Sequence, residues 1–179
     1  MLPPEIVVPY TEPETEWVRG RALRKVSPTR AHALLQRSLA TSLSAWAGKR
    51  GEVGTEWRFR ISPPGGPERP LVPDVAYVAI ERLRGLRGHD LEVPRLSPDV
   101  VVEVLSPEDK RLDLEDKIAT YLAAGTQLVI VADPRARKVE LHDGSGAQVV
   151  RLGQMLQHPA LPDFKLSITE LFEVIDPPS

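Results

Sequence analysis

The most constraining feature of the sequence is an almost wholly apolar run at residues 99–105 (DVVVEVL), followed by a helix signal and a second apolar run. Ser106-Pro107 and the two acids that follow are typical of a helix N-terminus. Gly125 predicts the end of that helix, and residues 127–132 predict a buried strand. Such a unit predicts a right-handed crossover between two parallel strands, which are covered on both faces.

The other elements of the chain surround this unit. Residues 16–18 and 22–26 alternate around Arg19-Gly20 and predict a hairpin, and Ser27-Pro28 predicts the start of a helix that ends near Gly48 and Gly51. Residues 81–97 predict a polar connection. The remaining predictions are strands over 52–61 and 72–80, a hairpin of 138–142 and 147–152, and a short helix near 168–174. The expected fold class is therefore α/β (α+β), a mixed β-sheet flanked by helices.

The length of 179 residues predicts one domain, which we expect over residues 14–175 after an arm of residues 1–13. The absence of cysteine excludes a disulfide scaffold, a thiolate zinc site and a cysteine nucleophile. No apolar run approaches the 18 residues of a membrane helix, and the first ten residues lack the pattern of a signal peptide. These features predict a soluble cytoplasmic protein without a membrane partner.

The net charge of −2 conceals an uneven distribution. Residues 17–51 contain eight basic side chains and no acid, whereas residues 92–116 contain eight acids and three basic residues. A basic segment suits a polyanion and an acidic cluster suits a cation. The same pattern also fits two solvated faces that attract each other.

Two acids stand where buried strands are predicted. Asp74 follows a proline at the start of one strand, and Glu103 interrupts the apolar run of the next. If the two strands pair, the carboxylates converge, and a cation between them relieves their repulsion. Oxygen ligands suit Mg²⁺ or Mn²⁺, and a backbone carbonyl after Glu103 is a possible third ligand. Alternatively, Asp74 is a strand-entry cap and Glu103 is a paired core acid.

Lys117 lies on the predicted helix after the Glu103 strand. A right-handed crossover lays this helix back over the sheet, so that the ammonium can reach the carboxylates, position a water and stabilise charge on a phosphate. Lys117 also fits a surface ion pair with Asp113, four residues earlier.

An ordered series of motifs over about residues 14–172 resembles the Uma-two family of putative restriction endonucleases, within the PD-(D/E)XK nuclease superfamily. The segment 97–107, which ends in Glu-Val-Leu-Ser-Pro, is the most specific of these motifs. The others are Glu16-Trp-Val-Arg-Gly-Arg21, Ser27-Pro28 with His32, Pro73-Asp74-Val75, Asp113 with Lys117 and Tyr121, Asp133-Pro134, and residues 161–166 with Leu171-Phe172.

The resemblance implies a restriction-endonuclease-like fold and a metal-dependent phosphodiesterase site. Asp74 and Glu103 are the implied ligands of Mg²⁺ (or Mn²⁺), and Lys117 is the implied catalytic lysine. The superfamily pattern places a lysine two residues after the acid, where this chain has Leu105. Lys117, on the following helix, is the residue that fits the role of this absent lysine.

Three further residues have two interpretations each. His32 matches a family position. It is either a catalytic group near the phosphate or a residue that caps and packs the helix. Glu16 fits a supporting acid of the site or an ion-pair residue of the hairpin. Glu56 joins Asp74 and Glu103 if strand alternation directs its side chain to their face of the sheet.

The resulting hypothesis is a Mg²⁺-dependent DNA endonuclease, expected to act as a homodimer because cleavage of both strands usually needs two copies. The basic segment would hold the DNA backbone, with Arg82, Arg84 and Arg87 as further candidates. Two alternatives stay open: a catalytically silent module that binds nucleic acid or protein, and a glycosidase with paired carboxylates. The tentative backbone-binding residues of the basic segment are Arg24, Lys25, Arg30 and Arg37.

Overall fold

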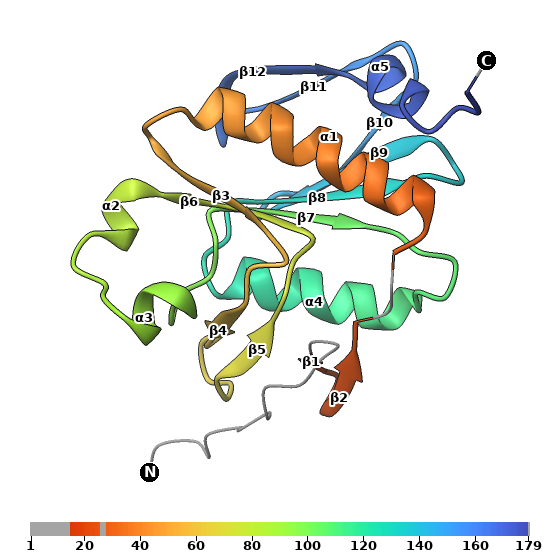
Figure 1. Ribbon diagram of the computed structural model, residues 1–179. Helices are drawn as coiled ribbons and strands as arrows, with labels where there is room; N and C mark the ends of the chain where they lie inside the picture. The colour runs from red at the N-terminus through yellow and green to blue at the C-terminus, as the bar shows by residue number, and fades with distance from the viewer. Residues whose placement is uncertain (1–14, 26–27, 179) are drawn as a thin grey trace.

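A six-stranded mixed sheet forms the centre of the computed structural model, which describes residues 15–25 and 28–178 (Figure 1). The predicted arm of residues 1–13 lies outside the described residues. Strands β7 and β8 are parallel, and the other neighbours in the sheet are antiparallel. The predicted parallel crossover and the mixed sheet flanked by helices are therefore confirmed. The spatial order of the strands is β10 (Gly146–Arg151), β9 (Lys138–Asp143), β8 (Leu128–Asp133), β7 (Val100–Val104), β6 (Val75–Ala79) and β3 (Gly51–Thr55).

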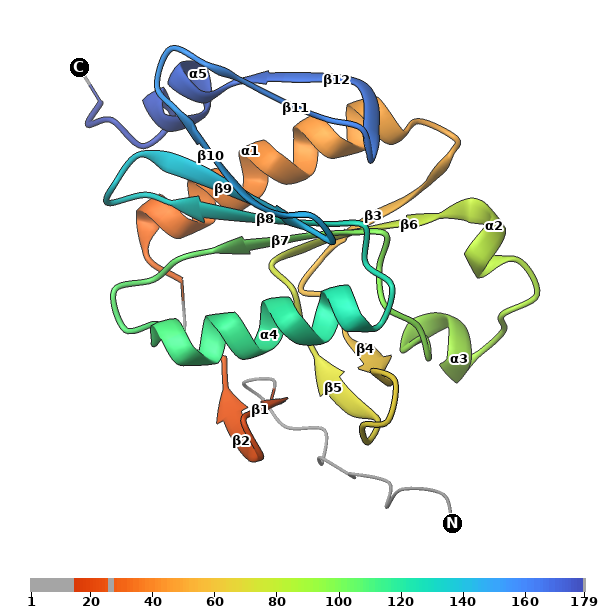
Figure 2. The same ribbon diagram turned by 180° about the vertical axis from the view of Figure 1, so that it is seen from behind.

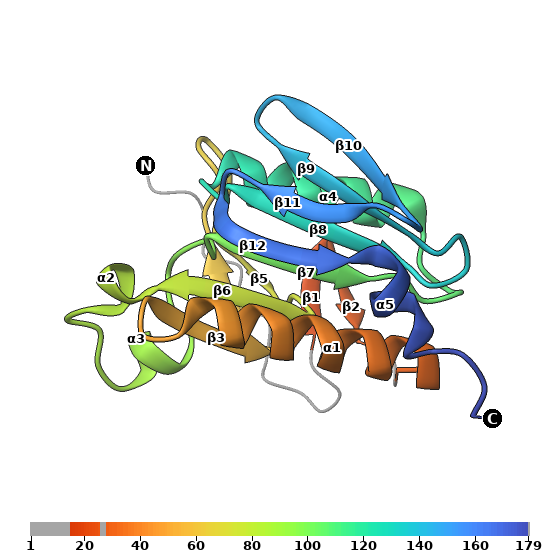
Figure 3. The ribbon, with the colours of Figure 1, turned by 90° about the horizontal axis from the view of Figure 1, so that it is seen from above.

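Helices and small hairpins cover the two faces of this sheet (Figures 1 and 2). One face carries α1 (Arg30–Ala47), α5 (Ile168–Glu173) and the hairpin of β11 (Met155–His158) and β12 (Leu161–Ser167). The other face carries α4 (Arg111–Ala123), the hairpin of β1 (Thr15–Val18) and β2 (Arg21–Arg24), and the hairpin of β4 (Phe59–Ile61) and β5 (Arg69–Leu71). From above, α1 lies along β6 and β3, and β11–β12 lies beside it (Figure 3). Within the described ranges, no helix is long and apolar enough to span a membrane.

Strand β7 is buried on both faces, and its alternation directs Glu103 toward α4. Val100, Val102 and Val104 join the core beneath α1, whereas Val101 joins the core beneath α4. Since successive side chains of a strand point to opposite faces, Glu103 shares the face of Val101. The acid that interrupts the apolar run therefore points between the sheet and α4.

The pairing of β6 with β7 brings Asp74 to the end of β7. The register sets Val75 opposite Val102, so Asp74, one residue before β6, lies beside the carboxyl end of β7. The condition under which the two acids were expected to converge, pairing of their strands, is thus met.

Both helix starts predicted at Ser-Pro pairs are wrong by a few residues. Helix α1 is capped by Thr29, whose side chain accepts a hydrogen bond from the His32 backbone N–H. Helix α4 begins at Arg111 because Asp109 accepts the Ser106 backbone N–H and closes a separate turn before the helix. Ser27, the predicted cap of the first helix, lies outside the described residues, and Ser106 is separated from α4 by this turn and does not cap it.

The strand predicted over 52–61 divides into two strands of different sheets. Glu56 adopts a φ of 52°, which turns the chain between β3 and β4. The polar connection contains the single-turn helices α2 (Ile80–Leu83) and α3 (His89–Glu92), and the hairpin β11–β12 was not predicted. Short elements of this kind depend on contacts with the rest of the fold rather than on local pattern.

Gly51→Ala is expected to destabilise the protein by about 2 kcal/mol or more, because a methyl group there has no room. A Cβ atom at Gly51 would overlap the Val78 carbonyl oxygen and the Tyr77 ring, which belong to the paired strand β6. Gly144→Ala is the control, since a Cβ atom at that exposed turn meets nothing within 4 Å. Chemical denaturation measures both; equal stability of the two variants would contradict the expected close contact between β3 and β6.

Candidate active site

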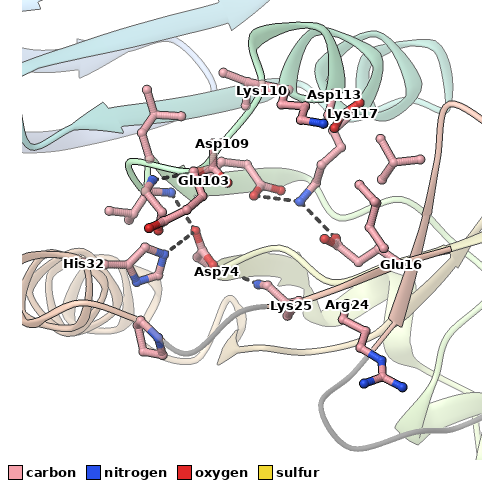
Figure 4. Close-up of a pocket in the computed structure, with 18 of the residues that line it drawn as sticks. Glu16, Arg24, Lys25, His32, Asp74, Glu103, Asp109, Lys110, Asp113 and Lys117 are labelled. Carbon is pink, nitrogen blue, oxygen red and sulfur yellow. Dashed lines mark hydrogen bonds and ion pairs between the residues drawn. The ribbon is translucent and has the colours of Figure 1, made fainter. Parts of the chain in front are cut away.

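A pocket of about 400 Å³ opens where the β1–β2 hairpin, α1 and α4 meet the ends of β6 and β7 (Figure 4). Residues that are far apart in the sequence contribute its charged lining. All four residues predicted as catalytic line this single pocket. The charged lining includes Glu16 from β1, Lys25 after β2, His32 from α1, Asp74 before β6, Glu103 from β7 and Lys117 from α4.

Asp74 is 3% exposed, and both of its oxygens have partners. Lys25 Nζ donates to Oδ1 over 2.8 Å. The Val104 backbone N–H donates to Oδ2 over 2.6 Å, and His32 Nε2 lies 3.2 Å from the same oxygen. Asp74 precedes β6, but the backbone N–H that it accepts lies at the end of the neighbouring strand β7 and not at the entry to its own strand; it also belongs to a charged cluster.

The contacts of Asp74 favour its ionised form. Burial disfavours the charge, but the hydrogen bond from His32 and the Lys25 ammonium hold the pKa of Asp74 well below its ordinary range. Burial likewise works against a charged His32, yet the hydrogen bond to Asp74 and the negative charge of Asp74 raise the pKa of the His32 imidazole. The two side chains thus stabilise each other's charged forms.

Lys117 lies in the interior and bridges two acids. Its Nζ lies 2.8 Å from Glu103 Oε2 and 2.9 Å from Glu16 Oε1. The Tyr121 hydroxyl donates to Glu103 Oε1 over 3.1 Å. Lys117 therefore makes the inward contact expected of it, and the interpretation as a surface ion pair with Asp113 is wrong. Glu16 is an ion-pair residue of the hairpin, and it also lines the pocket.

The β1–β2 hairpin is held against α4 by the opposite charges noted in the sequence. Arg21 pairs with Asp113 over 2.6 Å, and the Arg19 backbone N–H donates to Asp116 over 3.2 Å. Arg69 from β5 also pairs with Asp116. Here the basic and acidic segments attract each other, and the attraction fixes the hairpin that delivers Glu16 to the pocket.

The charge states of Glu103 and Lys117 depend on each other. Burial raises the pKa of Glu103 to about 7; Lys117 opposes this effect, and Asp74 and Glu16 add to it. Burial also disfavours the Lys117 ammonium, but Glu103 and Glu16 outweigh it and raise its pKa. The charge of Glu103 therefore depends on its cationic neighbour Lys117.

Lys25 lies inside an acid cluster formed by Glu16, Glu56, Asp74 and Glu103. A role in holding nucleic acid would instead place it on the outer surface. Besides Asp74, its Nζ contacts Glu56 Oε2 over 2.8 Å and the Val72 carbonyl oxygen over 2.9 Å. Its side chain is 18% exposed. Glu56 joins the cluster through this contact, and its positive φ explains why strand alternation could not place it.

The other three residues proposed to bind nucleic acid are exposed, and they differ in position. Arg24 lines the pocket. Arg30 donates to the carbonyl oxygens of Ile175 and Asp176 near the described C-terminus. Arg37 lies on the exposed side of α1 and does not line the pocket. The structure therefore brings only Arg24 of these three to the pocket.

Two residues of the site were missed by sequence reasoning. Tyr121 enters the sequence analysis only as a member of the motif series, and Gln36 belongs to none of its motifs. Gln36 Nε2 donates to Glu56 Oε1 over 2.7 Å and to the Asp74 carbonyl oxygen over 2.9 Å. Each lies four residues after a predicted site residue on its helix, Tyr121 after Lys117 and Gln36 after His32. This spacing places two side chains on one helix face and was the available signal.

The donor chemistry of the pocket fits a hard divalent cation. The carboxylate oxygens of Asp74 and Glu103 are the ligand type that Mg²⁺ and Mn²⁺ prefer, and three oxygens already surround the Lys25 ammonium. In the described part of the chain, no three His, Cys, Asp or Glu side chains converge as they would around a bound metal ion. The carboxylates contact lysines, a histidine and a backbone N–H instead.

Comparisons with known proteins agree with this fold. The model of the Uma2 family, whose description is "Putative restriction endonuclease", matches residues 5–169. A solved structure of a putative nuclease belonging to DUF820 from Anabaena variabilis is similar, with a TM-score of 0.80 and 23% sequence identity. The match covers 93% of this chain and 94% of that chain, and at this identity it supports the fold alone. No curated protein matches the chain significantly.

Proposed function

The chain belongs to the Uma2 family of putative restriction endonucleases, and we propose on this basis that it is a Mg²⁺-dependent DNA endonuclease. One observation carries the proposal. Asp74 and Glu103, from paired strands, reach a single pocket together with Lys117 from the crossover helix. Hard oxygen donors that can hold a metal ion, with a cationic donor beside them, suit metal-dependent hydrolysis of a phosphodiester.

Asp74 and Glu103 are the residues that would hold the metal ion. A bound Mg²⁺ supplies positive charge that polarises a phosphoryl oxygen and favours ionisation of water. Asp74 is suited to this role because His32 and Lys25 keep it ionised inside the protein. Burial works against the ionised form of Glu103, so its charge depends on Lys117. His32 acts here as a positioning residue, since its Nε2 contacts Asp74.

Lys117 is the residue proposed to act on the reacting groups. An ammonium has three N–H donors, and two of them point to Glu103 and Glu16. Among the described residues the third N–H has no partner, and Lys117 lines the pocket. We assign this donor to the attacking water or to a phosphate oxygen, where it stabilises the charge that develops in the transition state.

DNA is the substrate that the family description favours. Arg24 lies exposed at the pocket. It could contact a phosphate without breaking an ion pair of the acid cluster, because those pairs are made by Lys25 and Lys117. Cleavage of both strands would require two copies of the site, and a homodimer is the simplest assembly that provides them.

A second candidate, a catalytically silent binding module, is favoured by the internal ion pairs. Lys25 and Lys117 neutralise the buried acids without a metal ion. A protein that kept the fold for binding alone could retain such pairs. The two candidates differ in metal-dependent cleavage of DNA.

Glu103→Gln is expected to slow Mg²⁺-dependent cleavage of plasmid DNA about a hundredfold, because it removes one charged ligand of the proposed ion. Glu115→Gln is the matched control: this acid lies on the same side of the sheet, in α4, and makes an exposed pair with Arg111. The conversion of supercoiled plasmid, followed on gels, measures both rates. If Glu103→Gln and Glu115→Gln cut equally fast, Glu103 has no part in the reaction.

A further inference from the structure

The two lysines of the acid cluster use their donors differently. Lys25 directs its ammonium at three oxygens, on Asp74, Glu56 and Val72, at 2.8, 2.8 and 2.9 Å. Its three N–H groups are therefore all engaged. Lys117 contacts two oxygens and keeps one donor available. Lys25 consequently has no donor to offer a phosphate unless it gives up one of these contacts.

The three oxygens around Lys25 are held in place by other groups. Gln36 donates to the other oxygen of Glu56, and Glu56 adopts a positive φ that few non-glycine residues adopt. Asp74 is fixed by the Val104 backbone N–H and by His32. The Val72 oxygen belongs to the backbone next to β5. Two carboxylates and a backbone carbonyl, fixed in this way, form a donor set typical of a divalent cation site.

A metal ion that binds Asp74 at Oδ1 competes with the Lys25 ammonium, and one that binds at Oδ2 competes with the Val104 backbone N–H and His32. The Val104 donor is a backbone N–H at the end of a central strand, and His32 is anchored in the first turn of α1. Lys25 instead approaches on a long, unbranched side chain from the end of the peripheral β1–β2 hairpin. Its contact is therefore the one that can be given up without moving the sheet or α1.

We propose that Lys25 is a built-in counter-cation that occupies an oxygen cradle of Asp74, Glu56 and the Val72 carbonyl, and that a divalent metal ion displaces it. The proposal rests on the metal site of the proposed function, with which the cradle shares Asp74. Lys25 balances the buried acids when no metal is bound, and its charge opposes the metal when one arrives. This side chain thus sets the metal affinity of the site.

Lys25→Met tests the proposal, with Lys110→Met as the matched control. Lys110 is an exposed lysine that lines the same pocket but has no contact with the three oxygens. Calorimetric titration with Mn²⁺, without DNA, gives the affinities. Loss of Lys25 is expected to tighten Mn²⁺ binding about ten- to a hundredfold, the range of effects of a like charge at this separation. Lys110→Met should change it less than about threefold. An unchanged or weaker affinity of Lys25→Met would overturn the proposal.

The unaltered protein provides a second test in case Lys25→Met does not fold. An amine-acetylating ester modifies accessible lysines, and mass spectrometry locates each modified site. Acetylation of Lys25 is expected to be slow without metal and to accelerate at saturating Mn²⁺, whereas the exposed Lys49 serves as the reference in both conditions. Equal protection of Lys25 with and without bound Mn²⁺ would contradict displacement.

These readouts separate the two proposals. Tighter Mn²⁺ binding by Lys25→Met supports the role of Lys25 even if no DNA is cut. Metal-dependent cleavage by the wild type, combined with unchanged Mn²⁺ affinity of Lys25→Met, would leave the nuclease in place and reject the role of Lys25.

Discussion

Lys117→Met is expected to lower the free energy of unfolding by about 3–4 kcal/mol at pH 8, one of the largest stability effects of any single change in the site. The substitution preserves the side-chain length but leaves Glu103 and Glu16 buried without their shared cation. Breaking a buried pair on one side costs more than the pair itself contributes, because the remaining charge is neither hydrated nor paired. Denaturant unfolding followed by circular dichroism measures the loss.

The pH dependence of this loss follows from Glu103. Burial raises its pKa from an ordinary value of 4.5 to about 7, and Lys117 is the strongest influence that lowers it. Without Lys117 the pKa rises further. A carboxyl group whose pKa is raised on folding makes the folded state less stable as the pH rises from the unfolded to the folded value. The deficit of Lys117→Met is therefore expected to be smaller at pH 5 than at pH 8.

The double variant Lys117→Met with Glu103→Gln provides the control for this interpretation. It removes the unpaired charge together with its partner, so it should recover part of the lost stability. An equal loss at pH 5 and pH 8, without recovery in the double variant, would show that Lys117 stabilises the fold by packing alone.

Asp74→Asn is expected to reduce the rate of Mg²⁺-dependent DNA cleavage about a thousandfold or more, equivalent to about 4 kcal/mol of transition-state stabilisation. This carboxylate contacts Lys25, His32 and the Val104 backbone N–H, and it is also a proposed metal ligand. An amide at this position removes the charge and places a donor where three donors already converge. The effect should therefore exceed that of Glu103→Gln.

Asp90→Asn is the matched control for this experiment. Asp90 is exposed and pairs with Arg60, away from the pocket lining. The Asp90→Asn variant should therefore cleave DNA as fast as the wild type. Circular dichroism and thermal unfolding establish which variants are folded at the assay temperature. A folded Asp74→Asn variant that cuts as fast as Asp90→Asn would remove Asp74 from the proposed mechanism.

The central part of the fold was predictable because its signals are local and strong. The run around Val100–Val104, a helix and a second apolar run specify two parallel strands with one crossover. Alternation places the acid inside that run on the same face as Val101, and Lys117 lies on α4. The contact between Glu103 and Lys117 also required the lysine side chain to point inward, which the sequence left open and the structure shows.

The parts that were not predicted depend on contacts distant in the sequence. Lys25 follows a basic hairpin, and nothing near it in the sequence indicates that it turns inward to Asp74 and Glu56. Glu56 reaches this position only through a positive φ, which a propensity pattern does not show. The hairpin β11–β12 has too little alternation to be recognised, yet its Leu156 and Leu161 are fully part of the core beneath α1.

The most direct measurement of the central claim is DNA cleavage by the wild-type protein, with supercoiled plasmid and single-stranded DNA as substrates. The reactions contain Mg²⁺, Mn²⁺ or a chelator. We expect cleavage with either metal ion and none with the chelator, because Asp74 and Glu103 need a bound cation to act on a phosphate. Saturating Mn²⁺ binding without cleavage of either substrate would contradict it and favour a fold retained for binding.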